Sequence, residues 1–261
     1  MESTEPARQS RSEEDGCTVT RIEEGGKVYI TLEVRAISDS IDANDSLLRL
    51  IARELAALIP KEGSILAAGL GNRSVTPDAL GPLTAERVLA TRYIKGEIAR
   101  VTGLGGLRPV AVVSPGVLGC TGMEAFEVLR AIVEEIRPAA VVAVDALAAR
   151  SPSRLGCTVQ ISSAGISPGA GVGNSRPRID RSTLGVPVVS MGIPTVVDAV
   201  TLAQDIAGTV DRQKVAPRGA SMMVTPREID LIINRGSRLL AMGVNRALNP
   251  SLTVEQFEEL T

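Results

Sequence analysis

Four short apolar runs, each bounded by turn residues, constrain the fold of this chain more than any other feature. Continuous apolar runs of this length are typical of strands that are covered on both faces, as in a parallel sheet. Segments with apolar residues at helical spacing lie between them, and strands alternating with helices predict an α/β fold. We therefore expect a three-layer sandwich, with a mostly parallel sheet flanked by helices. The runs are SILAAGL, RPVAVVS, AAVVAVDAL and VPVVSMGI.

The helical spacing also predicts where the helices lie. In the last of them, Thr225 can serve as the cap, Pro226 fits the first turn and Glu228 completes a capping box. The expected helices span residues 45–59, 84–101, 122–136, 195–210 and 225–248. The stretch TVQIS predicts one further strand, antiparallel and at an edge of the sheet. The Gly-rich remainder of residues 153–185 predicts a long loop, and loops of this length are usually functional or mobile.

The N-terminal region differs in composition from the rest of the chain. Residues 1–26 are a polar arm, either a pro-segment or a hairpin, and residues 27–261 form one α/β domain. We expect residues 1–16 to be unstructured. The pair Gly25-Gly26 can close a two-residue hairpin between TVTRIEE and the alternating segment that follows it.

The absence of histidine from all 261 residues limits the chemistry available to this protein. It excludes a Ser-His-Asp triad and any histidine-ligated metal site, so acid–base catalysis would fall to carboxylates. The net charge is −2 and no basic patch suggests direct nucleic-acid binding. No apolar run reaches the length of a membrane span, and the charged N-terminus does not resemble a signal peptide. We therefore expect a cytoplasmic location, no membrane contact and no cofactor.

Two aspartates follow apolar runs at positions where α/β sheets bind ligands. Asp78 lies in the turn after SILAAGL, and Asp145 lies in the run AAVVAVDAL. Ligands in open α/β sheets collect beyond the carboxyl ends of the strands, and these two strands can be near neighbours. Two carboxylates held close together cannot both ionise easily, so one can activate water while the other, protonated, polarises a carbonyl. Asp78 follows Thr76-Pro77 at a predicted helix start, which favours its anion, so we expect it to be the more acidic.

Several other interpretations of these residues stay open on spacing alone. Asp78 could simply stabilise a helix start while Asp145 caps a turn. The two could also hold a hard divalent cation together with backbone carbonyls and water. A dinucleotide site is not expected, because Gly69-Leu70-Gly71 begins like GxGxxG but Ser74 occupies the third glycine position. The glycine cluster at residues 165–174 predicts either a flexible loop or the wall of a cleft.

Several long motifs resemble those of the germination proteases of spore-forming bacteria, over about residues 28–248. The matching stretches are GLGNRSVTPDALGP, SPGVLGCTGME, VVAVDALAARS, TVQISSAGISPGAGVGN, GIPTVVDAV and MVTPREIDLIINRGSRLLAMGVNRAL. The resemblance implies an atypical aspartic endopeptidase related in fold to the hydrogenase maturation endopeptidases. It implies Asp78 and Asp145 as the catalytic pair. We expect the substrate cleft to include Gly71, Asn72, Thr76, Ser162 and Gly169.

The resemblance also implies a biological setting. Members of the family degrade small acid-soluble spore proteins during germination, in the spore core, as tetramers made from zymogens. Three departures are visible: residues 1–27 contain no cleavage site resembling the substrate's, the region between Val200 and Val224 is short, and Ile166-Ser167 stands where the family has a histidine. From the resemblance and the aspartate pair we expect an endopeptidase that degrades small acid-soluble spore proteins and binds no metal. The alternatives are a catalytically silent binding protein on the same scaffold, or a metal-dependent maturation-type peptidase.

Overall fold

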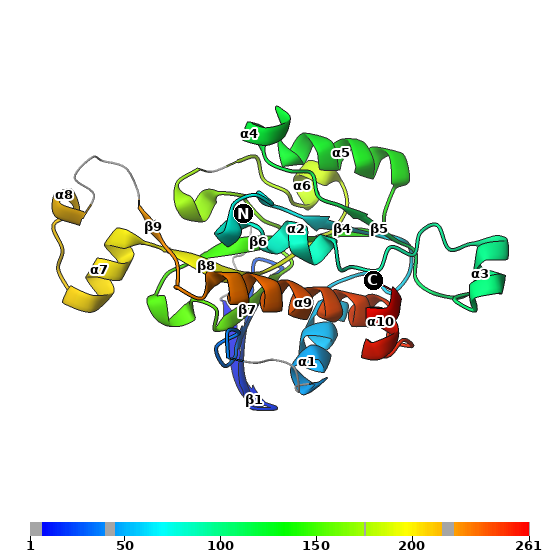
Figure 1. The fold of residues 1–261 in the computed structure, drawn as a ribbon, viewed down its shortest axis with the longest axis horizontal. Coiled ribbons are helices and arrows are strands. Elements are labelled where there is room, and N and C mark those ends of the chain that lie inside the picture. The colour runs from blue at the N-terminus through cyan, green and yellow to red at the C-terminus, as the bar shows by residue number, and fades with distance from the viewer. Residues whose placement is uncertain (1–6, 40–44, 175, 216–221, 261) are drawn as a thin grey trace.

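A nine-stranded sheet runs through the molecule, with helices on both of its faces (Figure 1). This computed structural model describes residues 7–39, 45–174, 176–215 and 222–260. The strand order is β1-β2-β3-β7-β8-β6-β4-β5, and β9 pairs with β8 outside this path. The strands are β1 (Arg8–Glu14), β2 (Cys17–Glu24), β3 (Lys27–Glu33), β4 (Ile65–Gly69), β5 (Val110–Val113), β6 (Ala140–Ala149), β7 (Thr158–Ser162), β8 (Val188–Asp198) and β9 (Met223–Val224). The α/β fold predicted from the apolar runs is confirmed.

The four apolar runs form the parallel part of the sheet, in the order β5-β4-β6-β8. The rest of the sheet is antiparallel and larger than a single edge strand. TVQIS, predicted at an edge, is β7 and lies inside the sheet, because β3, β2 and β1 continue the sheet beyond it. The sheet is therefore mixed, with a parallel half that is buried on both faces.

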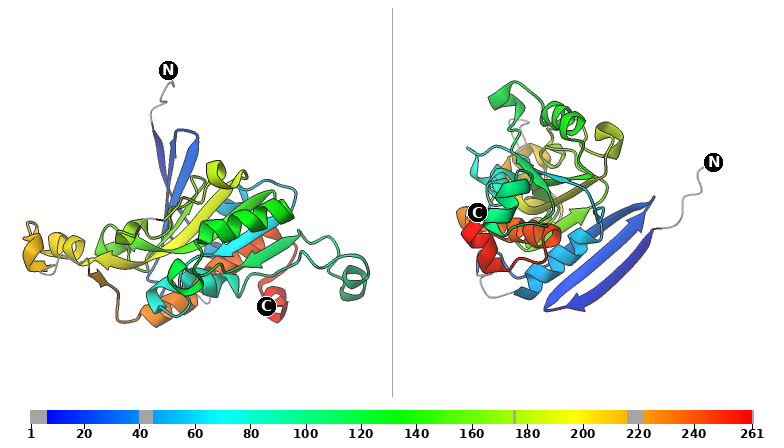
Figure 2. Two further views of the ribbon diagram at one scale, coloured as in Figure 1. Left: turned by 90° about the horizontal axis from the view of Figure 1, so that it is seen from above. Right: turned by 90° about the vertical axis from the view of Figure 1, so that its right-hand side faces the viewer.

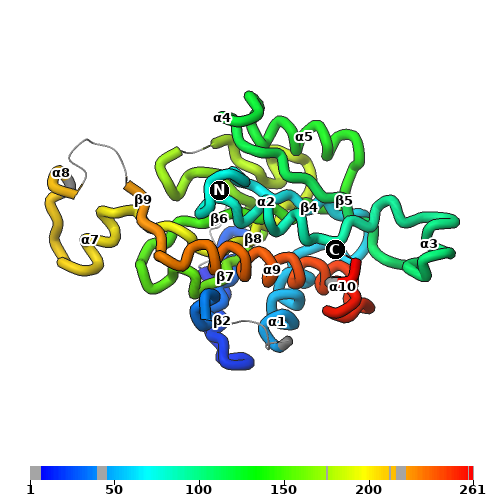
Figure 3. Tube along the Cα trace, in the orientation of Figure 1, coloured from blue at the N-terminus to red at the C-terminus, as the bar shows by residue number. Residues whose placement is uncertain are grey.

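Helices cover both faces of the sheet, and others project from the ends of the molecule. The helices are α1 (Asp45–Ala56), α2 (Leu80–Ala85), α3 (Gly96–Thr102), α4 (Leu118–Thr121), α5 (Ala125–Ile136), α6 (Arg181–Leu184), α7 (Ala199–Ala207), α8 (Arg212–Val215), α9 (Ile229–Leu248) and α10 (Val254–Leu260). Helices α1, α2 and α9 cover one face, and α5 and α6 cover the other. In the tube drawing, α3 and the α7–α8 segment project from opposite ends of this body (Figure 3). None of the described helices is long and apolar enough to cross a membrane.

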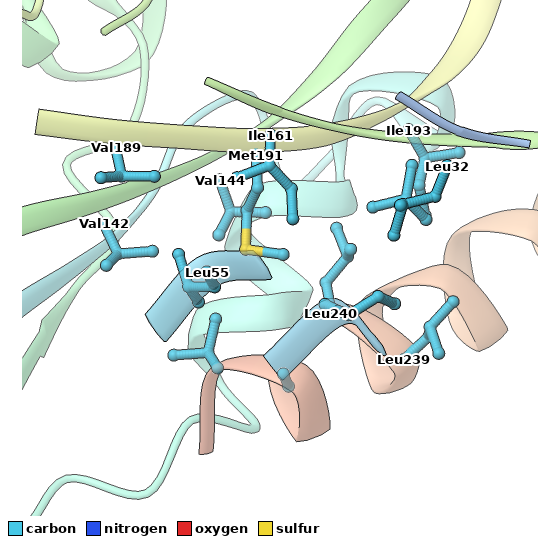
Figure 4. Close-up of a cluster of buried hydrophobic side chains, with 14 of the residues drawn as sticks. Leu32, Leu55, Val142, Val144, Ile161, Val189, Met191, Ile193, Leu239 and Leu240 are labelled. Carbon is cyan, nitrogen blue, oxygen red and sulfur yellow. The ribbon is translucent and has the colours of Figure 1, made fainter. Parts of the chain in front are cut away.

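Alternate residues of each buried strand supply the two halves of the core. Val142 and Val144 of β6 point toward Leu55 of α1 and Leu240 of α9 (Figure 4). Their neighbours on the same strand, such as Val141, pack on the opposite face beneath α5 and α6. The chain is only 2% aromatic, so these layers are built from aliphatic side chains that allow close helix–sheet packing.

Three of the predicted helices were wrong in extent. The helix expected over residues 195–210 begins only at Ala199, because β8 continues through Asp198. The helix expected over residues 84–101 is interrupted: α2 ends at Ala85 and α3 begins at Gly96. Between them Thr91 makes side-chain hydrogen bonds with the backbone near β5, which diverts the chain from a helical path. The last helix begins at Ile229 rather than near Thr225. The Thr225 hydroxyl does not cap it but donates to the backbone carbonyl oxygen of Thr195.

The N-terminal strands extend as a hairpin away from the body of the molecule (Figure 2). Residues 8–14, expected to be unstructured, form β1, and the turn at Gly25-Gly26 joins β2 to β3 as expected. Residues 1–6 lie outside the described part. A chain of ion pairs fastens the hairpin to α1: Glu54, 5% exposed, contacts both Arg21 and Arg53, and Arg53 also contacts Glu14.

Candidate active site

A cavity of about 800 Å³ opens at the carboxyl ends of the parallel strands. The loop after β4, the end of β6 and the end of β8 form its floor. Its walls come from the segments 116–126 and 166–174, together with Arg176 and Pro177. We call this cavity the cleft; it lies where ligands bind in other open α/β sheets.

Asp78 reaches the cleft from a short 3-10 helix, η1 (Thr76–Asp78), that follows β4. The backbone N–H of Asn72 donates to Asp78 Oδ2 at 2.6 Å. Burial raises the pKa of Asp78 above its ordinary value, and the Asn72 hydrogen bond lowers it in part by stabilising the anion. The loop that carries Asp78 therefore also supplies a group that favours its charged form.

Asp145 lies within β6 and is only 6% exposed, yet it borders the same cleft. Burial raises the pKa of Asp145 to about 7, with the negative charge of Asp78 adding to the rise. The N–H of Ala146, which donates to Asp145 Oδ1 at 2.9 Å, opposes this rise. Asp145 therefore keeps its proton up to about neutral pH.

The two strand ends that present these aspartates are locked together through their backbones. The N–H of Leu70 donates to the carbonyl oxygen of Val144, the residue before Asp145, at 2.8 Å. Gly81 of α2 packs against the same place, where a Cβ would lie 2.2 Å from Leu70 O and 2.4 Å from Val144 O. Glycine is required at this contact, because any side chain would push α2 away from the sheet.

The expected cleft residues divide into those that border it and those that do not. Gly71, Asn72 and Gly169 border it. Thr76 is exposed and instead borders a smaller hollow on the outer side of η1, toward α9. Ser162 is not among the cleft residues, because β7 runs antiparallel to β8 and its carboxyl end points away from the cleft. Its hydroxyl accepts a hydrogen bond from the N–H of Ala164.

Sequence reasoning missed several residues that shape the cleft. Phe126 and Met223 add apolar surface, and Thr195 borders the cleft from β8. Arg176 and Glu124 form an ion pair at 3.2 Å that joins the two walls. The motifs SPGVLGCTGME and GIPTVVDAV contain or adjoin most of these residues, so their unusual composition was a usable signal.

The geometry favours acid–base chemistry by carboxylates. Among the described residues, no group of three or more His, Cys, Asp or Glu side chains is placed to hold a metal ion. An acid that keeps its proton to about pH 7 can protonate one group while a second carboxylate in the same cleft, which accepts a backbone hydrogen bond, deprotonates another. Fold and site thus define a class: an α/β protein with a carboxylate pair in a cleft at the ends of its parallel strands.

Comparison with known proteins identifies the family within this class. A model described as germination protease matches residues 11–212. The germination protease of Caldanaerobacter subterraneus subsp. tengcongensis is 36% identical, with 95% of this chain and 89% of the relative covered. That of Clostridium acetobutylicum is 37% identical, with 92% and 84% covered. The chain belongs to the germination protease family and is an endopeptidase.

A solved structure shows a weaker likeness. A NiFe hydrogenase maturation protease from Thermococcus kodakarensis superposes with a TM-score of 0.40 and 17% identity, covering 73% of this chain and 98% of that chain. A similarity of this size does not bear on the chemistry of the cleft.

Proposed function

We propose that this endopeptidase cleaves small acid-soluble spore proteins, using Asp78 and Asp145 as its catalytic pair. One observation carries the proposal. Two carboxylates from distant parts of the chain border one cleft, and burial together with the charge of Asp78 raises the pKa of Asp145 to about 7. Two carboxylates that served only to stabilise the fold would gain nothing from the burial of an acid with a raised pKa.

The proposed reaction uses the two aspartates in different protonation states. The Asp78 carboxylate accepts a proton from a water molecule, and the oxygen of that water attacks the carbonyl carbon of the scissile peptide bond. Protonated Asp145 donates a hydrogen bond to the carbonyl oxygen. The C–N bond then breaks, and Asp78 passes the proton that it took from water to the departing amine, which regenerates the Asp78 carboxylate. The Asn72 N–H holds Asp78 in place while this happens.

The substrate class follows from family membership and is compatible with the cleft. A polypeptide in an extended conformation can contact the apolar side chains and glycine-rich loops that border it. The polar segment 1–26 as a pro-segment, assembly into a tetramer, and action in the spore core extend the same proposal. Mass spectrometry of the purified N-terminus and light scattering of the intact protein test the first two.

Asparagine substitutions test the catalytic pair. We expect Asp78→Asn and Asp145→Asn each to abolish cleavage of a purified small acid-soluble spore protein, with far-UV circular dichroism unchanged. Asp205→Asn, an exposed carboxylate on α7 outside the cleft, is the matched control and should retain full activity. Wild-type activity in either cleft variant would refute the pair.

The same assay separates the alternatives. A wild-type protein that cleaves other polypeptides but no spore protein would refute the proposed substrate class. Loss of activity in a chelator, restored by a divalent cation, would support a metal-dependent peptidase, whereas the aspartate pair predicts an unchanged rate.

A further inference from the structure

A β-bulge in β8 places one buried threonine at the border of the cleft. Along the β6–β8 ladder, Leu147 pairs with Pro194 and the next residue, Ala148, pairs with Val196. Thr195 is thus the extra residue of β8, without a partner on β6. Bulges of this kind bend a strand and redirect a side chain, and they are frequent beside active sites. Thr195 is 1% exposed and borders the cleft.

The redirected side chain of Thr195 holds the loop that carries Asp78. Its hydroxyl donates to the carbonyl oxygen of Pro77, the residue directly before Asp78, at 2.7 Å. In the described part of the chain, no backbone N–H donates to this carbonyl. Thr195 is itself held from the other side, since the Thr225 hydroxyl donates to its backbone carbonyl oxygen at 3.0 Å.

Strand β8 is also the neighbour of Asp145. Asp145 pairs with Gly192, where a Cβ would lie 2.2 Å from the Asp145 carbonyl oxygen. The same short stretch of β8 therefore touches the backbone at Asp145 and, three residues later, the backbone at Pro77. It acts as a common support for two segments that are far apart in sequence.

We propose that Thr195 is a positioning residue, whose hydroxyl sets the place of Asp78 relative to Asp145. This inference rests on the proposed function of the aspartate pair. Thr195 takes no part in proton transfer, because its hydrogen is directed to Pro77. Its effect is to keep the Asp78 carboxylate beside the protonated acid when a polypeptide enters the cleft.

The test replaces the hydroxyl with a methyl group and compares matched variants. Thr195→Val keeps the shape of the side chain and removes the hydrogen bond, whereas Thr195→Ser retains it. Thr84→Val is the control: Thr84 is also buried and donates to a backbone carbonyl at 2.7 Å, but within α2 and outside the cleft. We expect kcat to fall about 5- to 10-fold in Thr195→Val, as for one lost hydrogen bond, with KM changed less than kcat. Thr195→Ser should stay within about twofold of wild type.

A second readout follows the aspartates themselves. Carboxyl-carbon NMR titration of Asp145 should show its pKa lower in Thr195→Val than in wild type, shifted toward the value in Asp78→Asn, because the Asp78 charge moves away. Thr84→Val and Thr195→Ser should leave it unchanged. The other charged groups that border the cleft, Glu124, Arg150 and Arg176, are the same in every variant.

The outcomes are distinguishable. The inference would be overturned if a folded Thr195→Val protein had the same kcat and the same Asp145 pKa as wild type. It would also be overturned if Thr195→Ser showed the same reduction in kcat as Thr195→Val. Thr195→Ala serves if the valine variant does not fold, with the same criteria. If Asp78→Asn and Asp145→Asn remain active, the proposed function fails, while the titration of Asp145 in the Thr195 variants still decides whether Thr195 sets the geometry.

Discussion

Replacing Asp145 with asparagine should make the protein more stable above neutral pH while abolishing its activity. Asparagine has nearly the shape of the protonated acid and never ionises. Wild-type Asp145 is 6% exposed, and burial, followed by the charge of Asp78, raises its pKa from 3.8 to about 7. The unfolded chain releases this proton near pH 4, whereas the folded chain retains it until about pH 7.

The magnitude follows from the two pKa values. Between them the folded state binds more protons than the unfolded state, so its stability falls as the pH rises. Each pKa unit corresponds to about 1.4 kcal/mol, so ionising Asp145 in the folded state destabilises it by about 4 kcal/mol in total. About 3 kcal/mol of this loss falls between pH 5 and pH 8.5, because roughly two of the three units lie above pH 5. The raised pKa of Asp78 acts in the same direction.

Urea denaturation at pH 5 and at pH 8.5 measures this difference. The free energy of unfolding of wild type should decrease between the two pH values relative to that of Asp145→Asn, by an amount approaching about 3 kcal/mol. Asp205→Asn should follow the wild-type curve, since that carboxylate is exposed. Parallel curves for wild type and Asp145→Asn would show that Asp145 titrates like an ordinary surface acid and would refute the reasoning.

Three further predictions follow from the same structure. Under the proposed mechanism, the proteolytic rate should decline as the pH rises through about 7, because Asp145 loses the proton with which it hydrogen-bonds the scissile carbonyl oxygen, and a pH–rate profile of kcat tests this. Gly81→Ala should lower both activity and thermal stability, because its Cβ would overlap two backbone oxygens, and an unchanged melting temperature would contradict the packing argument. Glu54→Gln should lower the free energy of unfolding by about 1 kcal/mol, because Arg21 loses its carboxylate partner and Arg53 keeps only Glu14, while both arginines stay partly solvated. Faster tryptic cleavage of the N-terminal hairpin measures the same loss.

The parts of the fold that depend on local apolar pattern were predictable from sequence. The runs that became β4, β5, β6 and β8 are continuous and aliphatic, and such runs are stable only when both faces are covered. The position of Asp78 and Asp145 at one cleft followed from a rule of parallel sheets, whose carboxyl ends share one edge. Neither inference needed long-range contacts to be known in advance.

The parts of the fold that depend on contacts with distant segments of the chain were not predictable from sequence. The strand β7 was placed at an edge because nothing in TVQIS shows that three more strands continue beyond it. Ser162 was placed in the cleft because the direction of β7 was unknown, and an antiparallel strand directs its carboxyl end to the other side of the sheet. The bulge at Thr195 exists only in register with β6, so no property of β8 alone indicates it.

The arrangement around Asp145 also argues against a purely structural role for this residue. A neutral side chain at this position would remove a destabilisation of about 4 kcal/mol above pH 7, a large fraction of the net stability of a typical domain. The fold nevertheless brings a second carboxylate to the same cleft and fixes the surrounding backbone through Gly81 and the Leu70–Val144 hydrogen bond. Rigid surroundings keep Asp145 buried and close to the charge of Asp78, which sustains its raised pKa. If stability and activity change in opposite directions in Asp145→Asn, the buried acid is retained for its chemistry rather than for the fold.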